Sequence, residues 1–141
     1  MTREEIAAIV SRRIDAWHRR DIPGLVEDVS EDSVVDSPFA GGEGRGKAGF
    51  ARAYEAFFHA FPDARLTLQD VLIDGDQVML VGRLSGTDRG GFMGLTPTGR
   101  SFDIPIASHF EVKDGLIVHE RRIYDFTGLL VQVGALKAKP I

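Results

Sequence analysis

The chain of 141 residues contains no cysteine, which excludes disulfide bridges, thiolate catalysis and zinc–thiolate sites. It has no excess of basic residues either, because 17 lysines and arginines stand against 21 acids, a formal net charge of −4. Nucleic-acid binding needs a basic surface, so we expect no nucleic-acid partner. No segment approaches the roughly 20 apolar residues of a membrane span, and MTREEIAAIV lacks the apolar centre of a signal peptide. We therefore expect a cytoplasmic protein without a membrane partner.

Metal-binding patterns are also missing. No two of the four histidines are spaced like metal ligands with a third carboxylate nearby, so no metal site is expected. The glycine-rich segments do not follow a strand and open a helix in the way that phosphate-binding loops do. What remains is an ordinary composition, with 43% hydrophobic and 27% charged residues, in a chain of single-domain length. We expect one domain over residues 1–141.

The first half of the chain has the apolar spacing of helices. Apolar residues recur every three or four positions over residues 3–19, with Thr2 placed to cap the helix. A short second helix begins after Asp21, and a third covers residues 47–61 with a broad aromatic face. Between the last two we expect a short strand at 33–36 and a mobile glycine-rich loop at 41–46.

The second half alternates apolar and polar residues, as strands with one buried face do. The sequence predicts four long strands, over residues 64–73, 77–85, 101–112 and 116–125. It also predicts a short final helix over residues 126–133. Helices grouped before an antiparallel meander indicate the α+β class. We expect a strongly curved antiparallel sheet wrapped around the three N-terminal helices as a cone with an internal apolar pocket, a natural site for a small hydrophobic molecule.

The last two long strands predict where polar groups enter that pocket. Asp114-Gly115 has the residue types of a two-residue hairpin turn, and regular pairing from that turn sets Asp125 opposite Ile104. Directly opposed residues share a face, so Asp125 and Arg121 should lie on the apolar side with Ile106. An aspartate on an apolar face is costly unless it has partners or a use, which makes Asp125 a candidate catalytic acid/base. Equally, Asp125 fits an N-cap of the final helix.

Aromatic side chains are the candidates for the remaining pocket wall. Trp17 and Tyr54 carry polar atoms that need partners, and we expect them, with Phe58, to contact a ligand. Phe92 and Met93, between glycines in the segment 86–99, predict either a movable lid or a loop held by one buried aromatic residue.

Three segments resemble a known family. GFMGLTPTGRSFDIP (91–105), HFEVKDGLIV (109–118) and RRIYDFTGLLVQVG (121–134) are similar to the SnoaL-like polyketide cyclases and ester cyclases, within the nuclear transport factor 2-like superfamily that includes ketosteroid isomerase. The resemblance implies the cone fold. It also implies cofactor-independent acid/base chemistry, such as an intramolecular aldol ring closure of a hydrophobic, polyketide-like carbonyl compound.

The resemblance also implies roles for individual residues. Asp125 stands where cyclases of this type, and limonene epoxide hydrolase, hold an acid/base aspartate, whereas Asp36 stands where ketosteroid isomerase holds its base. The two oxyanion donors of that isomerase correspond to Arg13 and Ser108, so its oxyanion hole is not reproduced. Arg121 or Ser108 is then expected to stabilise the oxyanion, although Arg121 fits an inert ion pair with Asp125 equally well.

Two other functions are compatible with the sequence. The chain could be a non-catalytic carrier of a small apolar ligand, or a module that uses the same pocket for a peptide or subunit. An isolated, desolvated Asp125 favours the enzyme, and an Asp125 held by Arg121 or beneath the final helix favours the carrier. Asp36 fits a turn as well as a pocket role, since Asp-Ser-Pro commonly begins turns. We expect a homodimer through the outer face of the sheet.

Overall fold

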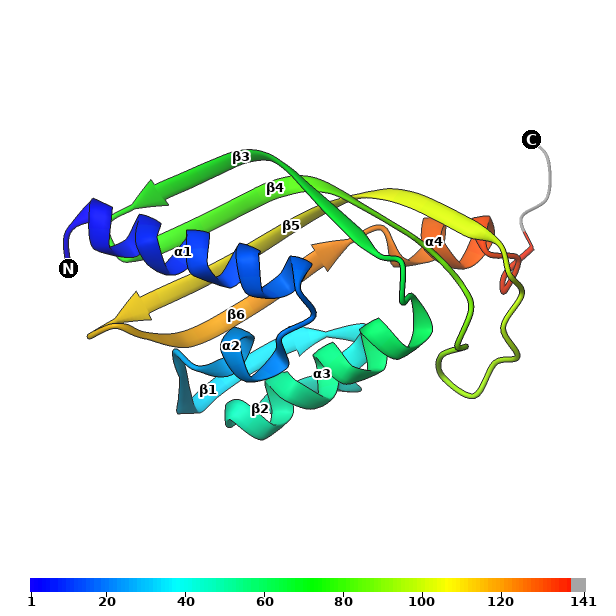
Figure 1. Ribbon diagram of the computed structural model, residues 1–141, viewed down its shortest axis with the longest axis horizontal. Coiled ribbons are helices and arrows are strands. Elements are labelled where there is room, and N and C mark those ends of the chain that lie inside the picture. The colour runs from blue at the N-terminus through cyan, green and yellow to red at the C-terminus, as the bar shows by residue number, and fades with distance from the viewer. Residues whose placement is uncertain (138–141) are drawn as a thin grey trace.

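Two α-helices precede the first two strands of this protein, a third precedes the last four strands, and a short α-helix follows them (Figure 1). The computed structural model describes residues 1–137. In chain order the elements are α1 (Arg3–His18), α2 (Ile22–Val26), β1 (Val29–Ser37), the 3-10 helix η1 (Pro38–Ala40), β2 (Gly42–Arg45), α3 (Gly46–Ala60), β3 (Arg65–Asp74), β4 (Gln77–Thr87), β5 (Ser101–Lys113), β6 (Leu116–Tyr124) and α4 (Phe126–Gln132). The expected α+β class is confirmed. Over this described part of the chain, no helix is long and apolar enough to span a membrane.

The strands form one six-stranded sheet in the order β2-β1-β6-β5-β4-β3. Every neighbouring pair is antiparallel except β1 and β6, which run parallel, so the sheet is mixed rather than wholly antiparallel as expected. The segment expected to be a mobile loop is ordered instead, because it forms β2, which pairs with β1. The pairing runs from Val34 opposite Arg45 to Ser37 opposite Gly42. Figure 1 shows the sheet curving around α1, α2 and α3, with α4 at the end far from the N-terminus.

Helix α1 begins where the sequence predicts and carries its apolar stripe inward. The Thr2 hydroxyl accepts a hydrogen bond from the Glu5 amide at 3.1 Å, and the Glu5 carboxylate accepts one from the Thr2 amide at 2.9 Å. This capping box satisfies two amides that the helix itself leaves free. The buried stripe contains one charged residue, Arg13, between Val10 and Trp17.

The hairpin of β5 and β6 starts in the expected register and then changes it. Asp114 and Gly115 both have positive φ, 51° and 79°, as a type I′ turn requires. Next to the turn, Val112 pairs with Ile117, but Glu111 pairs with His119. Val118 is therefore an extra residue, a β-bulge, and a one-residue shift reverses which side chains face inward.

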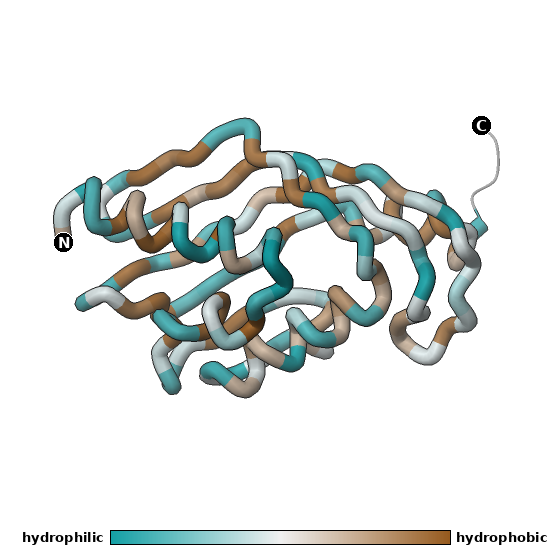
Figure 2. Tube along the Cα trace, in the orientation of Figure 1, coloured by the Kyte–Doolittle hydropathy of each residue, from teal (hydrophilic) through white to brown (hydrophobic). Residues whose placement is uncertain are grey.

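The loop between β4 and β5 is fixed at two points. Its middle is held by Phe92, which is buried, while Met93 beside it is 57% exposed. The buried carboxylate of Asp88 accepts hydrogen bonds from the Gly91 amide at 3.2 Å and the Thr98 amide at 3.1 Å. These contacts favour the held loop over the movable lid. In Figure 2 the parts of β3 and β4 nearest the N-terminus are drawn mostly brown, because the segments 71–73 and 78–81 are runs of apolar residues.

Candidate ligand-binding site

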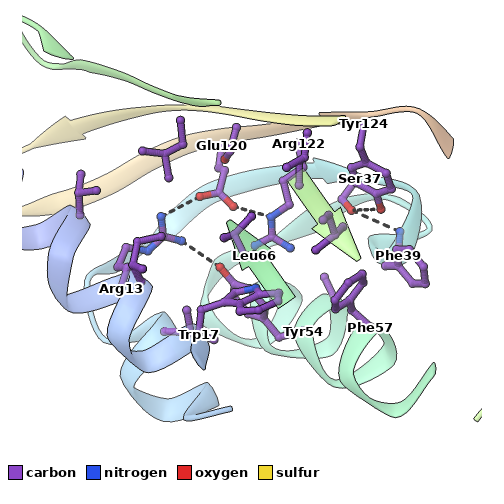
Figure 3. A pocket seen from close by; sticks show the side chains of 18 residues that line it. Arg13, Trp17, Ser37, Phe39, Tyr54, Phe57, Leu66, Glu120, Arg122 and Tyr124 are labelled. Atoms are coloured by element: carbon purple, nitrogen blue, oxygen red, sulfur yellow. Dashed lines mark hydrogen bonds and ion pairs between the residues drawn. The ribbon is translucent and has the colours of Figure 1, made fainter. Parts of the chain in front are cut away.

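An apolar cavity lies between the inner face of the sheet and the helices (Figure 3). Its volume is about 90 Å³, several times the about 10–15 Å³ that one water molecule needs. The residues that line it come from both halves of the chain: Val10, Arg13, Ile14 and Trp17 of α1; Leu25 of α2; Ser37 and Phe39; Ala53, Tyr54 and Phe57 of α3; Leu66, Leu80 and Leu84 of β3 and β4; Ile106 and Ser108 of β5; and Glu120, Arg122 and Tyr124 of β6. The cavity is therefore mostly apolar, with polar groups concentrated on a few positions.

A buried network of charges occupies one wall. Arg13 Nη1 donates to Glu120 Oε1 at 2.9 Å, and Arg122 Nε donates to Glu120 Oε2 at 2.6 Å. Arg13 Nη2 also donates to the Tyr54 hydroxyl at 3.1 Å. The three charged side chains are only 7%, 2% and 12% exposed, for Arg13, Glu120 and Arg122. Figure 3 shows Arg13 and Arg122 reaching Glu120 from opposite sides.

Mutual contact keeps all three groups ionised. Burial alone would raise the pKa of the Glu120 carboxyl, but the charges and hydrogen bonds of Arg13 and Arg122 together lower it to about 2. Burial would lower the pKa of both guanidinium groups, and the charge and hydrogen bonds of Glu120, with Tyr54, raise it instead. The cluster thus holds two positive charges and one negative charge at neutral pH. Glu120 is too weakly basic in this setting to abstract a proton efficiently.

The two arginines have donors left over. Among the described residues, Arg122 Nη2 and Arg13 Nε are buried without a hydrogen-bond partner. The Arg122 guanidinium lies over the Tyr54 ring, 4.3 Å from its centroid, and so keeps one favourable contact. Its Nη2 still lacks an acceptor, which is uncommon for a buried polar atom.

A second, neutral polar pair lies elsewhere in the cavity wall. The hydroxyl groups of Ser37 and Tyr124 are 3.5 Å apart, and Ser37 Oγ also accepts from the Phe39 amide at 3.3 Å. Burial raises the pKa of the Tyr124 phenol to about 12, so it is protonated at neutral pH. Tyr124 can therefore donate a hydrogen bond to a ligand oxygen.

Four of the residues predicted to bind the ligand line this cavity: Trp17, Tyr54, Ile106 and Ser108. Arg13, which corresponds with Ser108 to the oxyanion donors of the isomerase, lies in the same wall. The positions of the first four residues agree with the prediction.

The predicted acids and Arg121 lie elsewhere. Asp125 is exposed, and its carboxylate accepts from the Gly128 amide at 2.8 Å as the N-cap of α4. Arg121 is exposed too, and pairs with His109 rather than with Ser108. The Val118 bulge explains both errors, because it turns the odd-numbered residues of β6 beyond it outward. Asp36 is exposed on β1, next to inward-facing Ser37.

The two remaining aromatic predictions fall outside the cavity wall. Phe58 packs behind it, 5.3 Å from Trp17 and 6.2 Å from Tyr54 between ring centroids. Phe92 lines a separate groove of about 540 Å³, formed by η1, the end of α3 and the loop before β5. Phe39 lines both the groove and the cavity, so this residue lies between them.

Sequence reasoning missed Glu120, Arg122 and Tyr124, and gave Arg13 no role in the site. Arg13 had a detectable signal, since it occupies the apolar stripe of α1 at helical spacing between Val10 and Trp17. The β6 residues had none, because the bulge depends on pairing with β5. Residues 1–137 contain no group of three or more acidic or histidine side chains placed to hold a metal ion.

Comparison with known proteins identifies the family. The model of the SnoaL-like polyketide cyclase family matches residues 7–133, so the chain belongs to that family. No match is found among curated proteins.

Solved structures agree with this assignment. AclR from Streptomyces galilaeus, a candidate hydroxylase, is 28% identical with a TM-score of 0.83, covering 99% of this chain and 87% of its own. IdmH from Streptomyces antibioticus, a candidate polyketide cyclase, is 29% identical with a TM-score of 0.76. The match covers 91% of this chain and 97% of IdmH. TsrD from Streptomyces laurentii is 25% identical with a TM-score of 0.83. The match covers 96% of this chain and 99% of TsrD.

Proposed function

We propose that this protein binds a small, hydrophobic carbonyl compound in the cavity and promotes a cyclase-type ring closure of it. The observation that carries the proposal is the unpartnered Nη2 of Arg122, a buried cationic donor on a residue that lines a mostly apolar cavity. Such a donor stabilises an oxygen on which negative charge develops, and it acts strongly where water is excluded. Membership of the SnoaL-like family supports the same class of reaction.

The proposed chemistry differs from the one expected from the sequence in its acid and base. Glu120 is the only carboxylate among the cavity-lining residues, and both of its oxygens accept from arginine. An acidic 1,3-dicarbonyl substrate needs no strong base, because its enol already supplies the nucleophilic carbon. That carbon adds to a second carbonyl of the same molecule, one C–C bond forms, and the acceptor oxygen takes up the proton that the enol loses.

Two groups would assist this step. Arg122 would bind the acidic enol oxygen and favour its ionised, more nucleophilic form, and the neutral phenol of Tyr124 would donate a proton or hydrogen bond to the acceptor oxygen, on which negative charge develops during addition. Trp17 and the apolar wall would fold the substrate so that its reacting carbons lie close together. The conformational entropy is then lost when the substrate binds, and it no longer adds to the barrier of the reaction.

The test uses a linear aryl triketone methyl ester, with cyclised product measured by chromatography and mass spectrometry. Wild-type protein should accelerate closure, and Arg122→Gln and Tyr124→Phe should each lose most of the acceleration. His109→Gln, on the outer face of the sheet, is the control and should match wild type. Closure at the uncatalysed rate with wild-type protein would contradict the enzymatic proposal.

The second candidate is a carrier that binds such a compound without converting it. The pairing of Glu120 with two arginines favours it, because the cavity then lacks a free base. Proteins of this fold can hold small molecules: TerC, 17% identical with a TM-score of 0.75, has been crystallised with polyporic acid. Quenching of the fluorescence of Trp17, the chain's one tryptophan, without any product would identify the carrier.

We also propose that the protein is a homodimer through the outer face of the sheet. Leu72 and Ile123 are 59% and 54% exposed there, which leaves apolar side chains in contact with solvent. Light scattering after gel filtration should give twice the mass of the chain, and Ile123→Glu should give the monomer mass.

A further inference from the structure

We infer, on the basis of the proposed function, that the ligand carries an acidic oxygen and binds as an anion at Arg122. The acceptor of Arg122 Nη2 would be a carboxylate or the ionised oxygen of an acidic enol or phenol. This defines a charge requirement for the ligand, in addition to its hydrophobic body.

The charge of the buried cluster supports an anion. Arg13 and Arg122 share a single counter-ion, Glu120, so the cluster keeps one uncompensated positive charge beside an apolar cavity. Uncompensated charge in a region of low dielectric is unfavourable, and an arriving anion would neutralise it. A neutral ligand would leave that charge as it is.

The donors of the cluster point to the same conclusion. Arg122 uses Nε for Glu120, and its buried Nη2 has no acceptor. Tyr54 accepts from Arg13, so its own hydroxyl proton is free for a different acceptor. Ser108 lies directly opposite Arg122 on the neighbouring strand and on the same face. A carboxylate has two oxygens with several acceptor positions and suits such a group of donors.

The rest of the cavity limits the body of the ligand. The rest of the cavity wall is formed mainly by apolar side chains, among them Trp17, Leu80, Leu84 and Ile106. Ser37 and Tyr124 provide the one other polar pair, formed by neutral hydroxyl groups. The ligand class is therefore an organic acid, or acidic enol, with a compact apolar body and room for a second, uncharged oxygen.

A purely structural role for Arg122 would have a different signature. Its contact with the Tyr54 ring and its hydrogen bond to Glu120 would then account for its burial, and charge on the ligand would not affect binding. The distinguishing quantity is thus the ratio of affinities for an acid and its neutral counterpart, rather than the stability of the variant.

The experiment compares 3-phenylpropanoate with 3-phenylpropanamide, which share shape but differ in charge. Binding is measured by the fluorescence of Trp17 in the cavity wall. Wild type should bind the acid about tenfold more tightly than the amide, as charge-assisted hydrogen bonds exceed neutral ones by that amount. Arg122→Gln should bring the ratio close to one, and Arg122→Lys should keep part of it. Arg52→Gln, an exposed arginine of α3, should keep the wild-type ratio.

Each other outcome has a definite meaning. Equal affinity of wild type for the two compounds would overturn the anion site and leave the proposed ligand binding intact. A ratio that Arg122→Gln does not change would overturn the assignment to Arg122. Binding of neither compound would contradict the proposed function itself. If Arg122→Gln fails to fold, the Arg122→Lys ratio decides, because it must fall below the wild-type ratio if the guanidinium at this site is responsible.

Discussion

The guanidinium of Arg13 and the carboxylate of Glu120 stand 107 positions apart in the sequence and share a buried hydrogen bond of 2.9 Å. This contact joins α1 to β6 in the wall of the cavity. Arg122 binds the other oxygen of the same carboxylate. The cluster thus connects the helical half of the fold to the sheet. Its loss should lower both the free energy of unfolding and the affinity for the ligand.

Replacing Glu120 by glutamine should destabilise the fold strongly. Two arginines would then be buried without a counter-ion, and breaking a buried ion pair in this way costs about 3–5 kcal/mol. Urea unfolding measures the change. Asp103→Asn, which removes an exposed ion pair with Arg83, is the comparison and should cost less than about 1 kcal/mol. Equal costs for the two variants would contradict a central role for the cluster.

Acid should weaken the fold in a defined range of pH. The pKa of Glu120 is about 2 in the folded protein, below its ordinary value of 4.5, so the native state favours the ionised form. Its contribution is fully present above pH 4.5 and is lost as the pH falls from there toward 2. Glu120→Gln should unfold with a shallower dependence on pH in that range. Parallel acid profiles for the two proteins would contradict the lowered pKa.

The phenol of Tyr124 should govern part of the alkaline behaviour. Its pKa is raised to about 12 in the folded protein from an ordinary value of 10, so its stabilising contribution is present below pH 10 and declines as the pH rises toward 12. Absorbance titration of tyrosinate should show one of the two tyrosines ionising near the upper value. Tyr124→Phe should remove that step, and its persistence would assign it to another group.

Asp125 should matter for a helix rather than for the ligand. Because its carboxylate caps α4, Asp125→Ala should cost about 1 kcal/mol of unfolding free energy, and Asp125→Asn much less, since asparagine is an equally good cap. Both variants should bind 3-phenylpropanoate as wild type does. Loss of binding or of turnover in Asp125→Asn with an intact fold would restore the role first expected for this residue.

Truncating Phe39 should change which ligands fit. Phe39 lines both the cavity and the groove beside the loop that precedes β5, and its ring would be the barrier between them. Phe39→Ala should join the two spaces and favour phenylalkanoates longer than 3-phenylpropanoate, whereas Phe39→Leu should keep the wild-type preference. The affinity series is measured by Trp17 fluorescence, and an unchanged preference in Phe39→Ala would show that the ring is not the barrier.

The sequence predicted what depends on local interactions. The cap of α1 at Thr2, the start of α2 at Asp21 and the hairpin turn at Asp114 and Gly115 each depend on a few neighbouring residues, and the structure has all three. The family resemblance correctly indicated the curved sheet and the helices that it surrounds.

Features that depend on distant partners were missed. β2 is ordered by its pairing with β1, although its glycines alone indicate a loop. The bulge at Val118 depends on how β6 pairs with β5, and strict alternation from the turn therefore assigned Arg121 and Asp125 to the wrong face. Trp17, Tyr54, Ile106 and Ser108 were placed correctly because they lie on elements whose periodicity is uninterrupted.

One extra residue thus decides how far from the turn the inward-facing residues of β6 stand in the sequence. Deleting Val118 would remove the bulge and leave Glu120, Arg122 and Tyr124 facing inward, because His119 would still pair with Glu111 and Glu120 with Phe110. A relative that lacks the bulge residue would therefore present the same inward positions on β6, each one residue closer in sequence to the turn. Alignments of this hairpin are therefore meaningful only when they match side-chain orientation rather than residue count.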